Sequence, residues 1–389
     1  MKRKVLQITV LCLLFVRCTQ AQSPHTSVPP LQASILNAPP KVSEVEKQEY
    51  ELVFCLDATG SMNGLIATAK EKIWDIVSGI SQAQDVSKVK LGLVFYRDKG
   101  DAFVTKTYPL TDNIDSLYSQ LLAIQAQGGG DEPESVNKSL DEAVNKMPWS
   151  QNPQTFRTIF LVGDCPPHMN YNEVKYPESC AEANKKNVVI NTIKLGSSCG
   201  SAIPHFKKIA TLTNGTYQQL GQNAADVVYN TPYDDSIIYY SRYIDESKIY
   251  YGNTAQKEVM NSKKEMSLNL YDKSSSSATS SRASYNWTSA GKSNWFGSNE
   301  LLQDIIDGKV SLDTLPKEQL PKELQEKTKE EQKSIVLIKQ QERVYNMNRL
   351  DVLVKQKDVY IRTEKANNSG EESFSDKVIE TMKVQAKRK

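Results

Sequence analysis

Between residues 50 and 220, short apolar runs alternate with segments whose apolar residues recur at helical spacing. The runs Leu52–Leu56 and Thr158–Val162 carry apolar or β-branched residues at every position, which is typical of strands buried on both faces. Regular alternation of such strands with helices predicts an α/β fold, a doubly wound and mostly parallel sheet with helices on both faces. Right-handed crossovers then place any ligand at the carboxyl ends of the strands.

The first residues have the pattern of a secretory signal. A basic start is followed by an apolar run from Val5 to Val16 and by small residues ending at Ala21. The run is too short to cross a bilayer comfortably, and no other stretch is apolar enough to do so, so we expect no transmembrane segment. We expect cleavage after Ala21 and export, so that the protein is secreted, periplasmic or held at the cell surface. A lipoprotein anchor at Cys18 is an alternative, but Arg17 stands where such signals carry a small residue.

The rest of the chain divides by composition. A Ser-rich run at 274–284 is expected to be flexible, and a polar helix over 334–361 carries an apolar stripe that packs internally or binds a partner. The predicted regions are a signal peptide at 1–21, a linker at 22–48, an α/β domain at 49–225, a partly helical, Ser-rich connecting region at 226–298 and a helical C-terminal extension at 299–389.

The charge balance excludes one class of partner. The chain has 48 Lys and Arg against 46 Asp and Glu, a net charge of +2. Nucleic-acid binding calls for a basic face, so we expect no nucleic-acid partner.

The strongest candidate site follows the first buried strand. Asp57, Thr59 and Ser61 place a carboxylate and two hydroxyls two residues apart at the strand's carboxyl end. Oxygen donors converging on one point suit a hard cation such as Mg²⁺. Asp131 in a Gly-rich loop and Asp164 at the end of a later buried strand supply further carboxylates. If that strand lies beside the first, Asp57 and Asp164 face each other.

These elements resemble the metal-ion-dependent adhesion site of von Willebrand factor type A (VWA) domains. The resemblance implies that Asp57, Thr59, Ser61, Asp131 and Asp164 hold a divalent cation, Mg²⁺ first and Mn²⁺ or Ca²⁺ as alternatives. It also implies non-enzymatic binding of a protein, with one metal position open for a partner's carboxylate. Many family members have Thr where this chain has Asp131, and a third carboxylate would weaken the attraction for an acidic partner.

Further segments resemble an exported bacterial subgroup of that family. They are Tyr96–Asp101, the GGGDEPES stretch, the GDCPPH stretch, Leu320–Leu324 and the closing Gln385-Ala386.

Two other functions remain open. The metal could be purely structural or absent, which would make the domain a scaffold. Alternatively, Gly196–Gly200 matches the G-x-S-x-G elbow of serine hydrolases, with Ser198 as nucleophile. The only later histidine is His205, and no acid lies between the two as the usual chain order requires.

Four more residues have predicted roles. Arg97 and His168 lie in loops on the predicted metal face and are candidate contacts for a partner protein, with a structural ion pair of Arg97 and a solvated His168 as alternatives. Cys180 and Cys199 flank a predicted helix and strand whose ends should return to one sheet edge, so we predict a bridge between them.

Overall fold

One sheet of six strands, in the order β3-β2-β1-β4-β5-β6, organises the chain. Only β3 runs antiparallel, pairing with β2. This confirms the predicted α/β class. The computed structural model describes residues 48–82, 86–224, 226–367 and 373–387, so the predicted signal peptide and nearly all of the linker lie outside it. The strands are β1 (Gln48–Asp57), β2 (Val86–Tyr96), β3 (Thr105–Thr111), β4 (Phe156–Gly163), β5 (Val188–Leu195) and β6 (Tyr217–Leu220).

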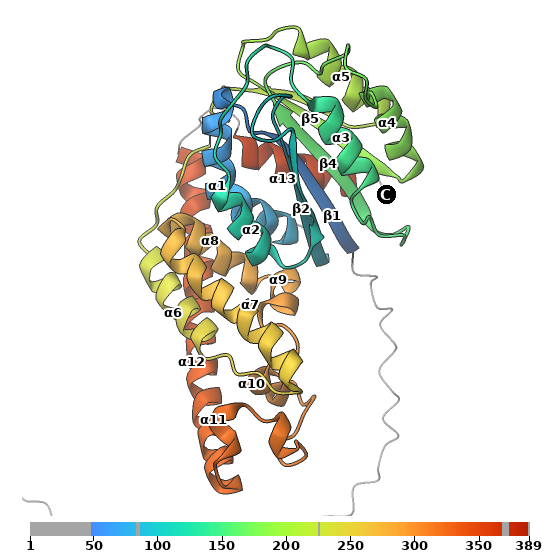
Figure 1. The fold of residues 1–389 in the computed structure, drawn as a ribbon. Coiled ribbons are helices and arrows are strands. Elements are labelled where there is room, and N and C mark those ends of the chain that lie inside the picture. Colours follow the sequence, from blue (N-terminus) through green and yellow to red (C-terminus); the bar gives the residue numbers. More distant parts are fainter. Residues whose placement is uncertain (1–47, 83–85, 225, 368–372, 388–389) are drawn as a thin grey trace, which may run out of the picture. The chain divides into compact units, whose positions relative to one another are not determined.

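Helices cover both faces of the sheet, as Figure 1 shows. One apolar core lies beneath α1 (Asn63–Gln82), α2 (Ile114–Ala123) and α13 (Phe374–Ala386). The other lies beneath α3 (Val136–Asn145), α4 (Tyr176–Lys185) and α5 (Ala202–Leu212). In α1 most of the apolar residues recur every three or four positions and are buried, against the sheet and against neighbouring helices, which explains why this segment is a long, well-packed helix.

The order in which the chain adds strands to the sheet reverses at β1. Its neighbours are β2 on one side and β4 on the other, both parallel to it, and Leu56 pairs with Phe95 and with Val162. Chain connections therefore leave β1 and β4 in opposite directions, which opens a crevice at their carboxyl ends. The adjacency of β1 and β4, on which the predicted meeting of Asp57 and Asp164 depends, is confirmed.

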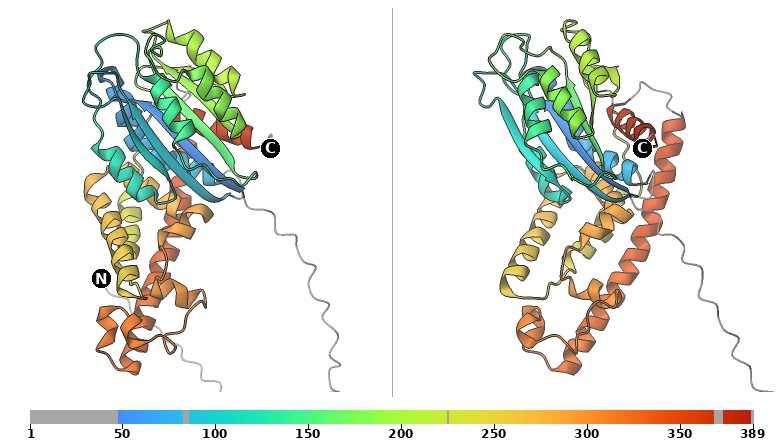
Figure 2. Two further views of the ribbon diagram at one scale, coloured as in Figure 1. Left: turned by 45° about the vertical axis from the view of Figure 1, so that its right-hand side comes forward. Right: turned by 90° about the vertical axis from the view of Figure 1, so that its right-hand side faces the viewer.

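The described residues, from Gln48 onward, form one compact unit by their contacts. The C-terminal helices therefore do not form a separate body, and the last of them, α13, returns to the sheet (Figure 2). Its Phe374 packs on Phe54 of β1, and Gln385 donates to Asn191 of β5 (2.7 Å). The intervening helices are α6 (Asp234–Glu246), α7 (Thr254–Lys273), α8 (Ser276–Trp287), α9 (Ser289–Trp295), α10 (Leu301–Ile306), α11 (Lys322–Gln325) and α12 (Lys329–Asn367). Within the described ranges, no helix combines the length and apolar character needed to span a membrane.

The prediction of a flexible Ser-rich run at 274–284 is wrong. Most of that run lies in α8, which is buried from Ser277 to Asn286 and packs against α1. The small side chains allow the two helices to approach closely, and Ser280 and Ser281 accept hydrogen bonds from the buried ammonium of Lys357. The serine content suggested flexibility, because composition does not show that a neighbouring helix will cover and order this segment.

The predicted bridge between Cys180 and Cys199 is also wrong. Cys199 is bonded to Cys165, with 5.1 Å between the Cα atoms, and Cys180 is a free thiol. Gly163 of β4 pairs with Lys194 of β5, so the loops that carry Cys165 and Cys199 leave the same edge of the sheet. Cys180 instead lies on the buried face of α4, where its thiol donates to the carbonyl of Ile209.

A buried ion network joins α2 to the C-terminal helices. The guanidinium of Arg282 on α8 contacts both carboxylate oxygens of Asp115 (2.6 Å each) and one of Asp245 on α6 (2.9 Å). Burial alone would raise the pKa of Asp245, but the charges of Lys248 and Arg282 outweigh it and lower that pKa. Each of these charges is therefore compensated, and removal of Arg282 would leave Asp115 without an ion-pair partner and Asp245 with Lys248 alone.

We predict that Arg282→Met lowers the free energy of unfolding by about 3–5 kcal/mol, because Asp115 would stay buried without its ion-pair partner and Asp245 would keep only Lys248. Arg242→Met is the matched control, since Arg242 pairs with Glu246 on the surface and should contribute no more than about 0.5 kcal/mol. Urea denaturation of both variants measures the difference. Equal effects would show that the network does not stabilise the unit.

Candidate metal centre

The first part of the site is the turn after β1. Asp57 is fully buried, and its Oδ1 accepts hydrogen bonds from the amide (2.9 Å) and the hydroxyl (2.7 Å) of Thr59. The hydroxyl oxygens of Thr59 and Ser61 lie 3.3 Å apart. The structure thus brings together the three residues of the predicted motif, with two hydroxyls beside one carboxyl group. The other oxygen of Asp57, Oδ2, is buried without a hydrogen-bond partner.

Asp164 supplies the second carboxyl group. It follows β4 and is buried, and its Oδ2 accepts a hydrogen bond from Gln222 (3.3 Å), whereas its Oδ1 has no partner. The preceding residue must be glycine, because a Cβ at Gly163 would lie 2.2 Å from the Tyr96 hydroxyl and 3.1 Å from Asp57 Oδ2. This close approach of β4 to the end of β1 positions Asp164 beside Asp57.

A third carboxyl group comes from Glu134, which sequence reasoning missed. Glu134 is only 4% exposed, and its Oε2 is buried without a hydrogen-bond partner. Its amide donates to the carbonyl of Pro166 (2.8 Å), and its carbonyl accepts from the amide of His168 (3.2 Å). This short parallel pairing joins the Gly-rich loop to the loop after β4. The available signal was its position two residues before α3, at the carboxyl edge of the sheet.

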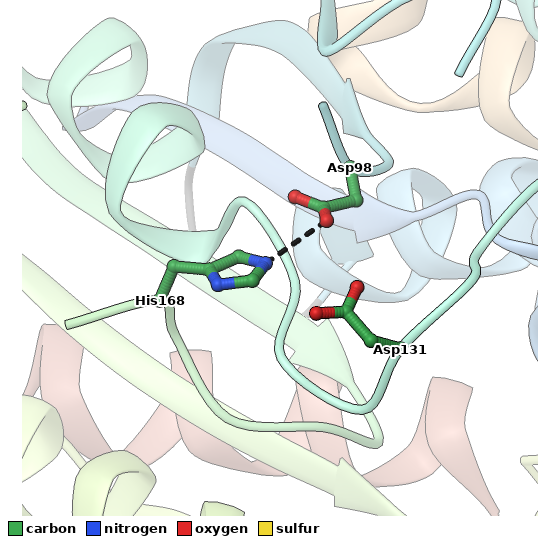
Figure 3. A group of neighbouring side chains, drawn as sticks. All are labelled: Asp98, Asp131 and His168. Atoms are coloured by element: carbon green, nitrogen blue, oxygen red, sulfur yellow. Dashed lines mark hydrogen bonds and ion pairs between the residues drawn. The ribbon is translucent and has the colours of Figure 1, made fainter. Parts of the chain in front are cut away.

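Asp131, the predicted contribution of the Gly-rich loop, lies elsewhere. It is exposed, and Figure 3 shows it beside Asp98 and His168. The three side chains each place one ligand atom within 4.8 Å of the others. However, the Asp98 carboxylate already accepts hydrogen bonds from Ser135 (3.0 Å), from His168 Nε2 (2.9 Å) and from Tyr171 (3.3 Å). Asp98 and its partners therefore form an internal network at the rim of the site.

The electrostatics of the crevice favour a cation. Burial raises the pKa of Asp57 to about 7, with a further contribution from the charge of Asp164 and an opposing one from the Thr59 hydrogen bonds. Burial and the charges of Asp57 and Asp98 raise the pKa of Glu134 to about 10. Three buried acidic side chains at the carboxyl edge of the sheet, those of Asp57, Glu134 and Asp164, thus leave one oxygen each without a hydrogen bond. Carboxylate and hydroxyl oxygens are the donors that Mg²⁺ and Ca²⁺ take, so the residues present fit a hard divalent cation.

Residues 51–232 match the family model of the von Willebrand factor A domain. The matched segment contains all of the sheet except the first three residues of β1, five of its covering helices and every residue of the site described above. The sheet order and the helices on both faces are those of a VWA or Rossmann-like α/β fold.

Individual proteins resemble this chain only at low sequence identity. BatB of Bacteroides thetaiotaomicron is 15% identical, with a TM-score of 0.33, over 44% of this chain and 90% of that chain. Proximal thread matrix protein 1 of the mussel byssus is 13% identical, with a TM-score of 0.35, over 46% of this chain and 43% of that chain. An ariadne-like RING finger protein of Acanthamoeba polyphaga mimivirus is 29% identical over 128 residues, which cover 31% of this chain and 12% of that protein.

The two predicted partner contacts at the rim of the site are both buried. Arg97 is 4% exposed and donates to the carbonyls of Ala58 (3.0 Å) and Gln125 (2.6 Å), so its guanidinium joins two loops instead of pairing with Asp98. His168 is 3% exposed, bonded to Asp98 and stacked on Tyr171, so it is not a solvated loop residue. Both positions support the loops of the site from within.

The hydrolase alternative gains no support from the geometry. Ser198 is exposed in the turn after β5, where its carbonyl accepts a hydrogen bond from Lys194. The ring of His205 contacts the Tyr176 hydroxyl (3.3 Å). Within the described residues, no hydrogen bond joins Ser198 to a histidine.

We predict that Gly163→Ala lowers the free energy of unfolding by about 1–3 kcal/mol, because its Cβ would overlap the Tyr96 hydroxyl and crowd Asp57. Gly130→Ala is the control, since a Cβ at Gly130 meets nothing within 4 Å, and its effect should stay within about 0.5 kcal/mol. Urea denaturation of the metal-free proteins measures both. If Gly163→Ala is as mild as Gly130→Ala, the close packing of β4 on Asp57 is not present in solution.

Proposed function

We propose that this protein binds another protein through a divalent cation, Mg²⁺ first, held at the carboxyl edge of its VWA domain. The observation that carries the proposal is the set of three buried oxygens without hydrogen bonds, one each on Asp57, Glu134 and Asp164. Burying such groups without partners is costly, and a cation between them would supply the missing interaction. The proposal is non-enzymatic, because the site offers ligands for a cation and lacks a paired nucleophile and base.

Each residue has a proposed role. Asp57, Thr59 and Ser61 are primary ligands, directly or through water, because their oxygens already converge on one turn. Asp164 and Glu134 complete or orient the shell from the neighbouring loops. Glu134 takes the position that the family resemblance assigned to Asp131, whose exposed carboxylate acts from the rim. When bound, the cation offers a free coordination position to an oxygen of the partner.

The charge of the shell limits the kind of partner. Three carboxylates around a dication leave a formal charge of −1, so the bound metal attracts a partner carboxylate less than a shell with two acids would. Exposed Asp131 and Glu132 add negative charge nearby. A partner's carboxylate can still coordinate the metal, but the surrounding contacts must supply more of the affinity.

A structural metal is the second candidate. The loops after β1 and β4 and the Gly-rich loop meet at this point, and a cation between them would stabilise the domain even without a partner. One observation favours it: the three acidic ligands more than offset the metal's charge. In this case removal of the metal would lower stability and leave binding of other proteins unchanged.

Export is proposed from the sequence of the first 21 residues. The Cys165–Cys199 bridge supports it, because disulfides persist mainly in oxidising compartments outside the cytoplasm.

We predict that Glu134→Gln weakens Mg²⁺ binding by about 10–100-fold, because a carboxylate oxygen of the shell becomes a neutral amide oxygen. Asp131→Asn is the matched control and should change the affinity by no more than about threefold, since an exposed charge is screened by solvent and salt. Isothermal titration calorimetry of chelator-treated protein measures both, with Asp57→Ala as the variant that abolishes the site. The opposite order of effects would assign Asp131 to the metal and Glu134 to a structural role.

Partner binding has its own test. We predict that the mature wild-type chain captures a protein from the surface fraction of the source cells when Mg²⁺ is present. This protein should no longer be captured when a chelator is added, or when the folded Asp57→Ala variant replaces the wild type. Capture that survives both changes, while both lower the unfolding temperature, would instead assign the metal a structural role.

A further inference from the structure

We propose that the Cys165–Cys199 disulfide makes the metal centre redox-sensitive: the bridged protein binds its cation tightly, and reduction by a dithiol weakens binding. This inference rests on the proposed function. It names a control of the same site that neither the motif nor the family match assigns.

The bridge is directly attached to the site. Cys165 follows Asp164 in the chain, so one peptide unit separates the disulfide-bonded residue from a proposed ligand. Asp164 otherwise has one side-chain hydrogen bond, a long one (3.3 Å) from the half-buried amide of Gln222. The position of its free oxygen therefore depends strongly on how firmly the loop after β4 is held.

The same loop also positions Glu134. Pro166 accepts a hydrogen bond from the Glu134 amide, and the amide of His168 donates to the Glu134 carbonyl. A displacement of residues 165–168 would therefore move Glu134 together with Asp164. Two of the three buried acidic side chains of the site thus depend on the segment that the disulfide tethers.

The other end of the tether is firmly anchored. Lys194 at the end of β5 is fully buried, and its ammonium donates to the carbonyls of Gly196 (2.9 Å) and Ser198. The Gly196 amide donates to Leu220 of β6 (2.8 Å). The turn that carries Cys199 therefore belongs to the sheet, and the bridge transmits that rigidity to the metal loop.

Cys199 has a backbone conformation that favours release. Its φ is +47°, in the left-handed region that residues other than glycine rarely adopt. With the bond to Cys165 broken, Cys199 is free to leave this unfavourable conformation, and relief of the backbone strain favours a rearranged turn in the reduced protein. The oxidised and reduced loops are then two distinct states, as a switch requires.

The bridge is open to a reductant on one side. Cys199 is half-buried between exposed Ser198 and Gly200, whereas Cys165 is only 8% exposed. A dithiol's thiolate attacks Sγ of Cys199, the S–S bond breaks, and Cys165 leaves as a thiolate that takes up a proton. The second thiol of the reductant then attacks the mixed disulfide and releases Cys199. Two electrons and two protons pass to the protein, and the dithiol becomes a cyclic disulfide.

The first test compares Mg²⁺ affinity between the oxidised wild type and the double variant Cys165→Ser/Cys199→Ser by calorimetry. We expect the double variant to bind about 10–100-fold more weakly, the effect of losing groups that orient a metal ligand. Cys180→Ser is the control, because this thiol is free and packs against Ile209 away from the crevice, and it should bind as the wild type does.

The second test does not depend on a folded variant. Because coupling between two equilibria is reciprocal, Mg²⁺ must stabilise the disulfide by the same factor by which the disulfide tightens Mg²⁺ binding. In a dithiol redox buffer, saturating Mg²⁺ should make the reduction potential of the Cys165–Cys199 couple about 30–60 mV more negative, because the disulfide is then harder to reduce. A potential that is unchanged by Mg²⁺, in a wild type that binds the metal, overturns the redox inference alone. Absence of Mg²⁺ binding by the oxidised wild type overturns the proposed function itself.

Discussion

Three buried acidic side chains, those of Asp57, Glu134 and Asp164, lie at the carboxyl edge of the sheet, and the charges of Asp57 and Asp164 act on Glu134. Asp57 and Glu134 have raised pKa values because burial and neighbouring acids disfavour their charged forms. Such a cluster is destabilising unless protons or a cation neutralise it. The surrounding structure keeps these side chains from moving apart. Gly163 allows β4 to lie close to Asp57, Arg97 joins the adjoining loops, and the backbone of Glu134 pairs with the loop after β4.

The rest of the unit supports this edge of the sheet from a distance. Helix α13 packs beneath β1, where Phe374 contacts Phe54, and the buried Arg282 network attaches α6 and α8 to α2. The C-terminal helices therefore contribute to the same core that aligns β1 with its neighbours. The segment that matches the VWA family model and the helices that follow it are consequently expected to unfold together, and a variant in one is expected to affect the other.

The sequence predicted the parts that depend on local patterns. Continuous apolar runs identified buried strands, helical spacing identified α1, and the position of Asp57 after β1 located the edge of the sheet. What it missed depends on three-dimensional neighbours. Asp131 and Glu134 lie three residues apart, and only the path of the Gly-rich loop around Asp101, with Gly128 at φ +83°, decides which of them turns inward. The pairing of Cys199 with Cys165 follows from strand register, which composition does not contain. The buried helix α8 followed from the proximity of α1, whereas its serine content suggested a flexible linker.

The location of the cation is the most direct test of this account. Crystals of the mature protein soaked in Mn²⁺ would give an anomalous peak wherever the ion binds. The account predicts one peak bounded by Asp57, Glu134 and Asp164, with their free oxygens about 2 Å away or joined to the ion through one water. A peak between Asp98, Asp131 and His168, or no peak in the crevice at saturating Mn²⁺, would contradict it.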